Sequence, residues 1–342
     1  MTFSVVKRKI CRFTVCILLL LGLVTSFNSC SSNKEFRRSF IVWGTNLDFI
    51  VISDLESVKV QEIIMETQKI ALEKSIVFNN YDKESEISRF NFSNANTITK
   101  MSDDFSKLFE ISIKYNQITD GYFDISLGSL TSKLNYKSDT SSRISKKEIN
   151  RIISKCIGLK NLDYDPQQQT ISKKVDCIQI DFGGIAEGYV LSLMIDKLVK
   201  SGIEDALINF GGNITTISKK HDWTIDLKKP YKDSEDAYIR SDLNNLSIST
   251  SGTYSKTFLV KNKKKSHIFD PINKEFKYSK NLSISVISDN PIHSDAISTS
   301  LISMPIETAI EKIKNFKNSK FLIIEALDNS TIEEIYNNLN TK

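Results

Sequence analysis

Residues that could hold a metal ion occur in the stretch "HSDAISTSLISM", whose pattern favours a helix. Asp295 and Thr299 are four residues apart, so a carboxylate and a hydroxyl share one face of that helix, and Ser294 could cap its N-terminus. Hard oxygen ligands placed in this way suit Mg²⁺, which takes few protein ligands and keeps positions open for phosphate oxygens. The same spacing also occurs in helices that bind nothing, so this is only a candidate metal site.

A second candidate is the stretch "IDFGGIAEGYV", from Ile180 to Val190, because three of the chain's 12 glycines fall within it. The pattern predicts an apolar strand that runs into Gly183 and Gly184 and then into a helix. Free N–H groups and the positive end of a helix dipole would then point at one spot, which suits phosphate. The glycine spacing matches neither the Rossmann nor the Walker nucleotide-binding motif. A plain tight turn between a strand and a helix explains the glycines equally well.

Three further stretches carry side chains that could do chemistry. His267 lies in "SHIFDP", between a predicted strand and a proline turn, and could act as a general base. Arg89 lies in the polar stretch "SEISRFN", which we predict as a turn, and Asp124 follows two aromatic residues in "GYFDISLGSL". Each of these side chains could instead serve packing or lie on the surface.

Apolar periodicity predicts the elements that must position these residues. Helices are predicted over 56–78, from an N-cap at Ser102 to Gly121, and over 147–159, 188–202, 294–304, 306–316 and 329–340. A strand or hairpin is predicted over 40–53, strands over 205–214, 222–227, 246–252, 266–270 and 282–288, and a polar surface excursion over 130–151. Strands and helices neither alternate regularly nor separate into two groups, which favours an α+β fold over a doubly wound sheet.

The first 30 residues are typical of an export signal rather than of a folded domain. Four basic residues lie within 7–12, and the apolar segment 13–24 is too short to span a bilayer without extension. The end of this region, "SFNSC", resembles a bacterial lipoprotein signal, in which the cysteine, here Cys30, becomes the lipidated N-terminus. An uncleaved membrane anchor is the alternative, and it would place the domain on the same side of the membrane. We therefore predict an exported protein that is lipid-anchored on the periplasmic side of a bacterial membrane.

These boundaries divide the chain into a signal peptide over 1–29, a tether over 30–39 and one large domain over 40–342. Loss of the signal removes four basic residues and no acidic residue from a formal net charge of +5, which leaves +1 and argues against nucleic-acid binding. Cys156 and Cys177 are the cysteines that remain after Cys30, and they could form a disulfide or stay as buried thiols.

Seven short motifs, taken together and in this order, resemble those of the ApbE family, the FAD:protein FMN transferases. They are "SEISRFN", "GYFDISLGSL", "IDFGGIAEGY", "INFGGNI", "STSGTYSK", "HIFDP" and "SDAISTSL". They follow the family's spacing over roughly residues 40 to 310, and the lipoprotein-like signal agrees with the family as well. The resemblance implies a single α+β domain related to the T-fold, with FAD as the substrate and Mg²⁺ bound to its pyrophosphate.

The resemblance also assigns site residues. In this family the metal is held by a main-chain oxygen of the glycine cluster and by two side chains of the late helix, which correspond here to Gly184, Asp295 and Thr299. The glycines would then let the backbone approach the metal and the pyrophosphate, where a Cβ would obstruct them. Flavin and adenine contacts correspond to Trp43, Tyr81, Tyr122, Phe123, Asp124, Asp181, Glu187 and Phe269. Aromatic faces stack on flat rings and carboxylates accept hydrogen bonds from ring or ribose donors, which agrees with these residue types.

The reaction that the resemblance implies is transfer of FMN from FAD to a Thr or Ser hydroxyl of a target protein, with release of AMP. His267 is the candidate base, and Asp295 is the catalytic metal ligand. The expected partner is an exported acceptor protein with a Ser/Thr-Gly-Ala-Ser/Thr-like motif, such as the flavin subunits of sodium- or proton-linked redox pumps. This chain lacks that motif, so we do not expect it to be flavinylated itself. Two alternatives stay open: an Mg²⁺-dependent FAD pyrophosphatase that releases FMN and AMP, and a lipoprotein that binds FAD without turnover.

The chain departs from the family pattern at four places, one of which is that "PINKEF" lacks the Gly expected after the His-Ile-x-Asp-Pro turn. Glu187 stands where many relatives have Lys, and a carboxylate cannot pair with pyrophosphate directly, so we expect it to lie behind the metal ligands. Trp43 replaces a usual Met, and Ser298 stands where some relatives have a further Asp.

Overall fold

The computed structural model of the protein describes residues 33–133, 145–231, 235–254, 257–260, 263–278, 281–327 and 331–339. The predicted signal segment, Cys30 and residues 134–144 of the predicted excursion over 130–151 lie outside these ranges. Among the residues described, no helix has the length and apolar character that a membrane crossing requires. The chain from Glu35 onward folds as one unit.

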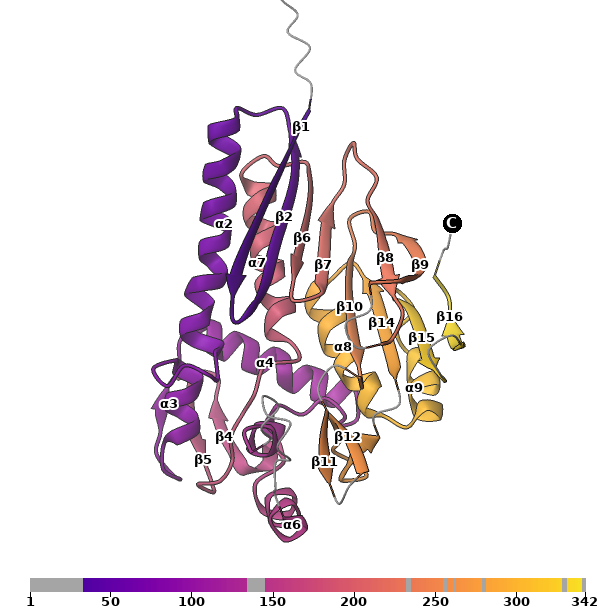
Figure 1. Ribbon diagram of the computed structural model, residues 1–342. Helices are drawn as coiled ribbons and strands as arrows, with labels where there is room; N and C mark the ends of the chain where they lie inside the picture. Colours follow the sequence, from indigo (N-terminus) through magenta and orange to yellow (C-terminus); the bar gives the residue numbers. More distant parts are fainter. Residues whose placement is uncertain are drawn as a thin grey trace, which may run out of the picture. The chain divides into compact units, whose positions relative to one another are not determined.

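An eight-stranded sheet organises this unit (Figure 1). Its strands lie in the order β1 (Lys34–Val42), β2 (Thr45–Ser53), β6 (Asp205–Phe210), β7 (Asn213–Ile217), β10 (Ser247–Gly252), β14 (Leu282–Ser288), β15 (Lys320–Ala326) and β16 (Ile332–Asn337). Neighbours from β2 to β16 pair antiparallel, and β1 and β2 form a hairpin around Trp43 and Gly44. In β14, "LSISVIS", every residue after the first is buried, so this strand needs a packed layer on each side.

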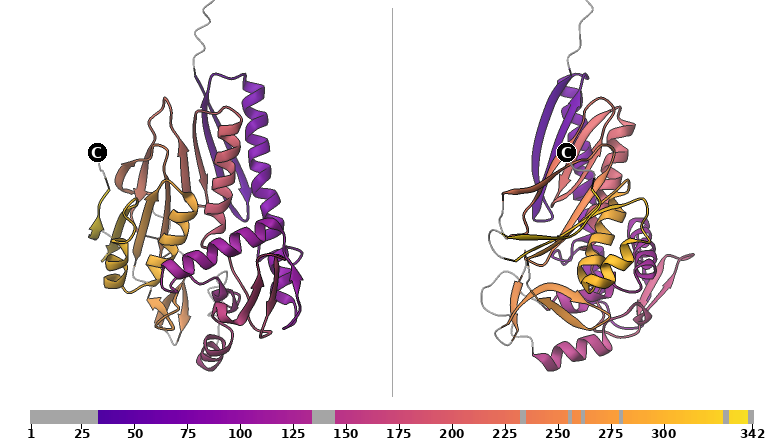
Figure 2. Two further views of the ribbon diagram at one scale, coloured as in Figure 1. Left: turned by 180° about the vertical axis from the view of Figure 1, so that it is seen from behind. Right: turned by 90° about the vertical axis from the view of Figure 1, so that its right-hand side faces the viewer.

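Four helices cover one face of the sheet, as Figure 2 shows. They are α2 (Ser57–Phe78), α7 (Ala186–Lys200), α8 (Pro291–Ser303) and α9 (Ile306–Ile313). In α2 the buried residues Val60, Ile63, Ile64 and Ala71 recur at helical spacing and turn one side of the helix to the core. All four helices were predicted from apolar periodicity.

A hairpin covers part of the opposite face. Its strands are β8 (Thr224–Lys228) and β9 (Ala237–Asp242), which pair antiparallel. Ile225 and Leu227 of β8 form one buried cluster with Ile248, Ile287 and Leu322 of the large sheet. Packed layers therefore lie on both sides of β14, as its burial requires.

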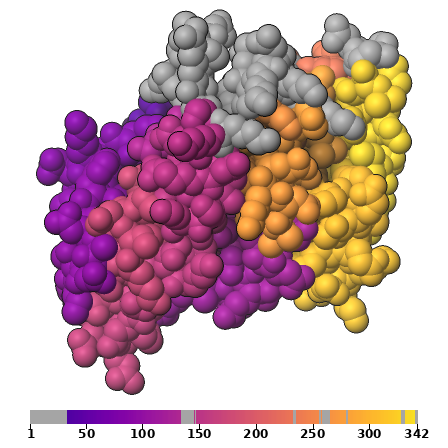
Figure 3. All heavy atoms as spheres, turned by 90° about the horizontal axis from the view of Figure 1, so that it is seen from below, coloured from indigo at the N-terminus to yellow at the C-terminus, as the bar shows by residue number. Residues whose placement is uncertain are grey.

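The remaining elements gather beyond one end of the large sheet (Figure 1). They are α3 (Glu86–Phe92), β3 (Thr99–Lys100), α4 (Asp103–Ile118), η1 (Ile125–Leu127), α5 (Gly128–Thr131), α6 (Lys146–Lys155), η2 (Leu159–Asn161), β4 (Leu162–Asp165), β5 (Thr170–Lys173), β11 (Thr257–Val260), β12 (Lys263–Asp270) and β13 (Glu275–Tyr278). β3, β5 and β4 form one small sheet, and β11, β12 and β13 form another. Figure 3, from below, shows magenta and pink parts of the chain beside an orange part. As predicted, Ser102 caps α4, because its hydroxyl accepts from the Phe105 N–H at 3.2 Å.

A disulfide joins two parts of this region. Cys156, at the C-cap of α6, is bonded to Cys177, and the two Cα atoms are 5.3 Å apart. The bridge lies with Leu130, Ile152 and Phe269 in a second buried cluster. Of the two alternatives left open by the sequence, a disulfide or two thiols, the structure shows the disulfide. Cys177 also leads directly into the glycine stretch, so the bridge anchors the chain just before the candidate site.

The C-terminal segment is a strand, so the helix predicted over 329–340 is wrong. β16 pairs antiparallel with β15, with a bulge between Ile323 and Ile324. β15 was not predicted; it is buried along most of its length and would otherwise leave its backbone groups unpaired at the sheet edge. Ile332 and Ile335 fit a helical spacing, but β-branched residues beside an open sheet edge favour the strand.

Three other boundaries differ from the predictions. β1 begins at Lys34, so residues 34–39, which were predicted as a tether, belong to the sheet. α8 is capped by the Asn290 side chain, with a proline in its first turn, and Ser294 is therefore not the N-cap. The turn predicted around Arg89 is the helix α3, with Ser85 as its N-cap.

Candidate functional site

The first turn of α7 and the loop before it lie so close to α8 that no side chain fits at two glycines, Gly188 in the helix and Gly184 in the loop. A Cβ on Gly184 would lie 2.6 Å from Thr299 Cγ2. A Cβ on Gly188 would lie 2.5 Å from the Pro291 carbonyl oxygen and 2.8 Å from Asp295 Cβ. The two helices therefore run antiparallel, with Gly184 against Thr299 and Gly188 against Asp295. The glycines are needed for this helix contact itself, which is a reason that the sequence alone did not reveal.

Asp295 is a buried carboxylate in the middle of the contact. It is 5% exposed, and its Oδ2 accepts a 2.9 Å hydrogen bond from the Gly188 N–H. Asn213 and Ser249 also lie within hydrogen-bonding reach of the carboxylate. Burial raises the pKa of Asp295 to about 6, although these hydrogen bonds oppose the shift. A cation beside the group would favour its ionised form again.

Polar side chains continue from Asp295 along β7 and β10. The Asn213 Nδ2 donates to Glu187 Oε2 at 2.8 Å, and the Asn213 Oδ1 accepts from the Ser249 hydroxyl. The hydroxyl oxygens of Ser249 and Ser298 are 3.1 Å apart, and those of Ser251 and Ser298 are 3.0 Å apart. Glu187 is therefore connected to the Asp295 site through one amide group.

Asp181 is held through both of its carboxylate oxygens. Its Oδ1 accepts from Asn80 Nδ2 at 2.9 Å and from the Gly183 N–H at 2.8 Å. Its Oδ2 accepts from the Thr131 hydroxyl at 3.0 Å. The carboxylate thus has a fixed orientation at the entrance to the glycine stretch.

The segment before Asp181 does not form a strand, so the strand predicted there is wrong. Asn91 takes the place of a neighbouring strand, because its amide accepts from the Ile180 N–H at 2.8 Å and donates to the Ile180 carbonyl at 2.9 Å. Lys173 is 1% exposed and donates to the Asn91 carbonyl at 3.0 Å. A distant side chain therefore satisfies the backbone groups that a sheet would otherwise satisfy.

Tyr122, Phe123 and Asp124 lie in the turn between α4 and η1. Tyr122 is half-buried, and burial together with the negative charge of Asp270 raises its pKa. Phe123 is buried in the main core. Asp124 accepts from the Ser126 N–H at 2.8 Å, and burial raises the pKa of Asp124. The turn therefore offers one partly open ring and one shielded carboxylate.

Trp43 and Tyr81 differ in their surroundings. The Trp43 Nε1 donates to the Ala71 carbonyl at 3.0 Å, and its ring centre lies 5.3 Å from that of Phe210. Tyr81 is 81% exposed and lies near the charge of Asp181. An exposed ring beside a fixed carboxylate can stack on a flat ligand without loss of packing, whereas Trp43 is already part of the packing.

His267 and Phe269 lie on β12, in the second small sheet. His267 is half-buried, with its Nδ1 3.5 Å from the Ser266 hydroxyl. Phe269 belongs to the second buried cluster, whereas α8 packs in the main core. The turn after β12 approaches the Tyr122 turn, because a Cβ on Gly121 would lie 3.4 Å from Ile272 Cδ1. β12 thus lies beside the aromatic turn, and it also contacts α8, with Ile268 packed against the main core.

The oxygen donors at the α7–α8 contact fit a hard cation. Within the described ranges, no three His, Cys, Asp or Glu side chains gather as a metal site. The predicted ligands are not such a cluster, because only one of them is an acidic side chain. They are the Gly184 carbonyl, the Asp295 carboxylate and the Thr299 hydroxyl. A carboxylate and a hydroxyl one helical turn apart, against a glycine backbone, have the donor chemistry that Mg²⁺ prefers.

The family model described as "ApbE family" matches residues 44–323. The chain belongs to the ApbE family. Two curated relatives are named "FAD:protein FMN transferase". The one from Buchnera aphidicola is 27% identical over 254 residues, which are 72% of this chain and 72% of that protein. The one from Haemophilus influenzae is 26% identical over 271 residues, which are 76% of this chain and 77% of that protein.

Solved ApbE structures share the fold. The flavin transferase ApbE from Vibrio cholerae superposes with a TM-score of 0.76 at 22% identity, over 89% of this chain and 97% of that one. The ApbE protein from Thermotoga maritima gives a TM-score of 0.76 at 22% identity, over 88% of this chain and 97% of that one. The prediction of a single α+β, ApbE-like domain is confirmed.

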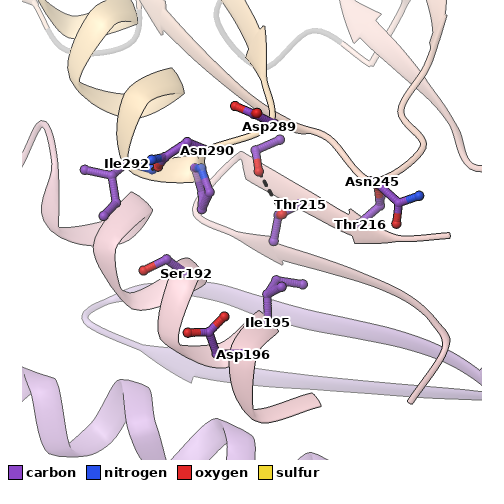
Figure 4. A pocket seen from close by; sticks show the side chains of 11 residues that line it. Ser192, Ile195, Asp196, Thr215, Thr216, Asn245, Asp289, Asn290 and Ile292 are labelled. Atoms are coloured by element: carbon purple, nitrogen blue, oxygen red, sulfur yellow. Dashed lines mark hydrogen bonds between the residues drawn. The ribbon is translucent and has the colours of Figure 1, made fainter. Parts of the chain in front are cut away.

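A pocket of about 480 Å³ in this ApbE-family chain is lined by none of the three predicted metal ligands; Figure 4 shows its wall. It is lined by Ser192, Ile195, Asp196, Thr215, Thr216, Asn245, Ser247, Asp289, Asn290, Pro291 and Ile292. The hydroxyls of Thr215 and Ser247 are hydrogen-bonded at 2.8 Å in its wall. The α7 residues in this wall, Ser192, Ile195 and Asp196, all follow Gly188 along the helix, so the pocket lies past Gly188, on the far side from Gly184.

Three side chains at the ApbE site were not predicted, namely Asn80, Asn91 and Asn213. Each orients a predicted residue or its backbone and carries no charge of its own. Asn91 and Asn213 lie inside two of the matched motifs, "SEISRFN" and "INFGGNI". The motifs marked these positions, but only the structure shows what each amide holds.

Proposed function

We propose that this protein is an FAD:protein FMN transferase that works with Mg²⁺. The observation that supports the proposal most directly is the meeting of Gly184, Asp295 and Thr299 where α7 begins. Curated relatives that match most of the chain carry this activity in their names. The start of α7 also presents the positive end of a helix dipole, which favours a pyrophosphate group.

Gly184, Asp295 and Thr299 would hold the ion through a carbonyl, a carboxylate and a hydroxyl oxygen. A bound Mg²⁺ supplies positive charge that offsets the charge on the pyrophosphate. Asp295 is suited to its role because the Gly188 N–H and nearby side chains orient the carboxylate before any ligand arrives.

The reaction proceeds when the hydroxyl oxygen of an acceptor Thr or Ser attacks the phosphorus on the flavin side of the pyrophosphate. A P–O bond to the acceptor forms, the bond to the AMP phosphate breaks, and AMP leaves with the bridging oxygen. His267 takes the hydroxyl proton as general base. FMN stays on the acceptor through a phosphodiester bond.

FAD itself is bound by the aromatic and acidic residues around the site. Tyr81 and Tyr122 stack on the flat rings, and Asp124 and Asp181 accept hydrogen bonds from ring or ribose donors. Of the other predicted contacts, Phe123 and Phe269 are buried and Trp43 and Glu187 are partly buried, and these residues shape the walls of the site.

The proposed location is outside the cytoplasm, with a lipid anchor at Cys30 on the periplasmic side. The disulfide between Cys156 and Cys177 supports export, because disulfides persist in oxidising compartments. The acceptor is then an exported protein with a Ser/Thr-Gly-Ala-Ser/Thr-like motif, such as a flavin subunit of a redox pump.

Incubation with FAD, Mg²⁺ and a candidate acceptor protein tests the function. The expected result is a fluorescent flavin band at the acceptor's position on a denaturing gel, with one AMP released for each flavin attached. Free FMN without a labelled protein would show a pyrophosphatase instead. Bound but intact FAD would show a carrier.

A further inference from the structure

Asn213 stands between the two carboxylates of the α7–α8 contact. It is the first residue of β7, directly after Gly211 and Gly212, and is 8% exposed. Its Nδ2 donates to Glu187 Oε2 at 2.8 Å, and it also lies within hydrogen-bonding reach of Asp295. A primary amide has two N–H donors on one nitrogen, so a single Asn can serve both carboxylates.

Further contacts fix the Glu187 carboxylate, the Asn213 amide and the Asp295 carboxylate in place. A Cβ on Gly211 would lie 2.9 Å from Glu187 Oε2, so the hairpin backbone closes directly over the Glu187 carboxylate. The Ser249 hydroxyl donates to the Asn213 Oδ1, which sets which end of the amide faces the carboxylates. Asp295 in turn accepts from the Gly188 N–H at 2.9 Å. Rotation of the amide would therefore break hydrogen bonds at both of its ends.

We propose that Asn213 is a positioning residue that joins Glu187 and Asp295 into one unit and sets the affinity of the site for a divalent cation. The inference rests on the proposed function, because it takes Asp295 as a ligand of that cation. Two carboxylates near each other repel, and the amide donors offset this repulsion while they hold the Asp295 carboxylate in place. Side chains that orient a metal ligand in this way typically change metal affinity about 10- to 100-fold when they are removed.

Binding of Mn²⁺ to the mature protein without FAD, followed by electron paramagnetic resonance of the free ion, tests the proposal. We expect Asn213→Ala to raise the Kd for Mn²⁺ about 10- to 100-fold. Asn213→Asp, which keeps the size but places a third carboxylate in the cluster, should bind Mn²⁺ with a changed affinity and a different pH dependence. It also provides an isosteric variant if the alanine variant folds poorly.

Thr215→Val is the matched control. Thr215 lies two residues further along β7 and makes an equivalent cross-strand hydrogen bond, 2.8 Å long, to the Ser247 hydroxyl. A merely structural effect would lower the melting temperature in both variants and leave the Kd for Mn²⁺ unchanged in both. The proposal requires the Kd to change in Asn213→Ala and not in Thr215→Val.

Glu187→Gln tests the joint role of the two carboxylates. If Asn213 acts by joining them, the double variant Glu187→Gln/Asn213→Ala should bind Mn²⁺ no more weakly than Asn213→Ala alone. Strictly additive effects, or wild-type affinity in Asn213→Ala, would overturn the proposal. Wild-type protein that binds no Mn²⁺ and transfers no FMN would instead contradict the proposed function, so the two failures are distinguishable.

Discussion

The Thr299 side chain occupies the space that a Cβ on Gly184 would need, since the closest approach would be 2.6 Å, to Thr299 Cγ2. Gly184→Ala is therefore expected to push α7 and α8 apart and to lower the free energy of unfolding by about 1–3 kcal/mol. FMN transfer should fall by about a hundredfold, because displacements of about 1 Å at a reacting centre can cost that much. Urea denaturation and AMP release measure the two effects.

Thr299→Ser provides a rescue of this variant, because Ser lacks the obstructing Cγ2 methyl group. The double variant Gly184→Ala/Thr299→Ser should regain part of the lost stability. Equal stability of the double variant and Gly184→Ala would show that another group is the obstacle.

Asp295→Ala should abolish activity while it spares the fold. Loss of a metal ligand should reduce AMP release by more than about a hundredfold, since even the side chains that orient ligands matter 10- to 100-fold. Burial raises the pKa of Asp295 to about 6, so at neutral pH the ionised carboxylate destabilises the metal-free protein. Its removal should therefore leave the fold intact. Ser300→Ala, on the same helix with its hydroxyl bonded to the Ile297 carbonyl, is the control. Unchanged AMP release from Asp295→Ala would rule out the metal assignment.

The predictions from sequence succeeded where local pattern decides the outcome. The N-cap of α4 at Ser102 and the buried stripe of α2 depend on neighbouring residues, and the structure confirms both. The approach of the glycine stretch to the distant helix α8 is not local, yet Gly184 and Thr299 were placed together because motifs in register imply a shared site.

The failures came where tertiary partners override the local pattern. The segment 332–337 has helical spacing, but the open edge of β15 selects a strand. Ile180 has the apolar setting of a strand, but the Asn91 amide supplies its hydrogen bonds. No local pattern around residue 180 indicates a side chain 89 positions away. The hydrogen bonds between Asn91 and Ile180 could therefore not be predicted from periodicity.

Tyr81→Ala should weaken FAD binding without a change in stability. The ring is 81% exposed, so its removal costs little packing, while loss of one stacking contact of about 0.5–1.5 kcal/mol should raise the KM for FAD about two- to tenfold. Phe92→Ala, which removes a ring that is 70% exposed on α3, is the matched control. Equal KM values for the two variants would place Tyr81 outside the FAD site.

Asp124→Asn should stabilise the protein at neutral pH and weaken FAD binding. Burial raises the pKa of Asp124 above its ordinary value of 3.8, so its contribution to stability is fully present below that value and is lost as the pH rises through the raised pKa. An amide does not titrate, so the stability advantage of Asp124→Asn should grow from pH 4 to pH 7. Urea denaturation at both pH values measures it, with Asp163→Asn, on the exposed part of β4, as control. A constant difference between wild type and variant would contradict the assignment.

Reduction of the disulfide should loosen the chain that carries Asp181. Cys177 lies four residues before Asp181, and the bridge to Cys156 closes a segment with a sequence separation of 21. Its loss should lower the free energy of unfolding by about 3 kcal/mol, because the unfolded chain regains loop entropy. The KM for FAD should rise as well, since the segment is then held in place only by its hydrogen bonds, such as those of Asn91 to Ile180 and of Thr131 to Asp181. Cys156→Ser/Cys177→Ser measures both effects, and dithiothreitol should do the same to the wild type but leave the double variant unchanged. A double variant with wild-type stability and KM would show that the bridge supports neither the fold nor the site.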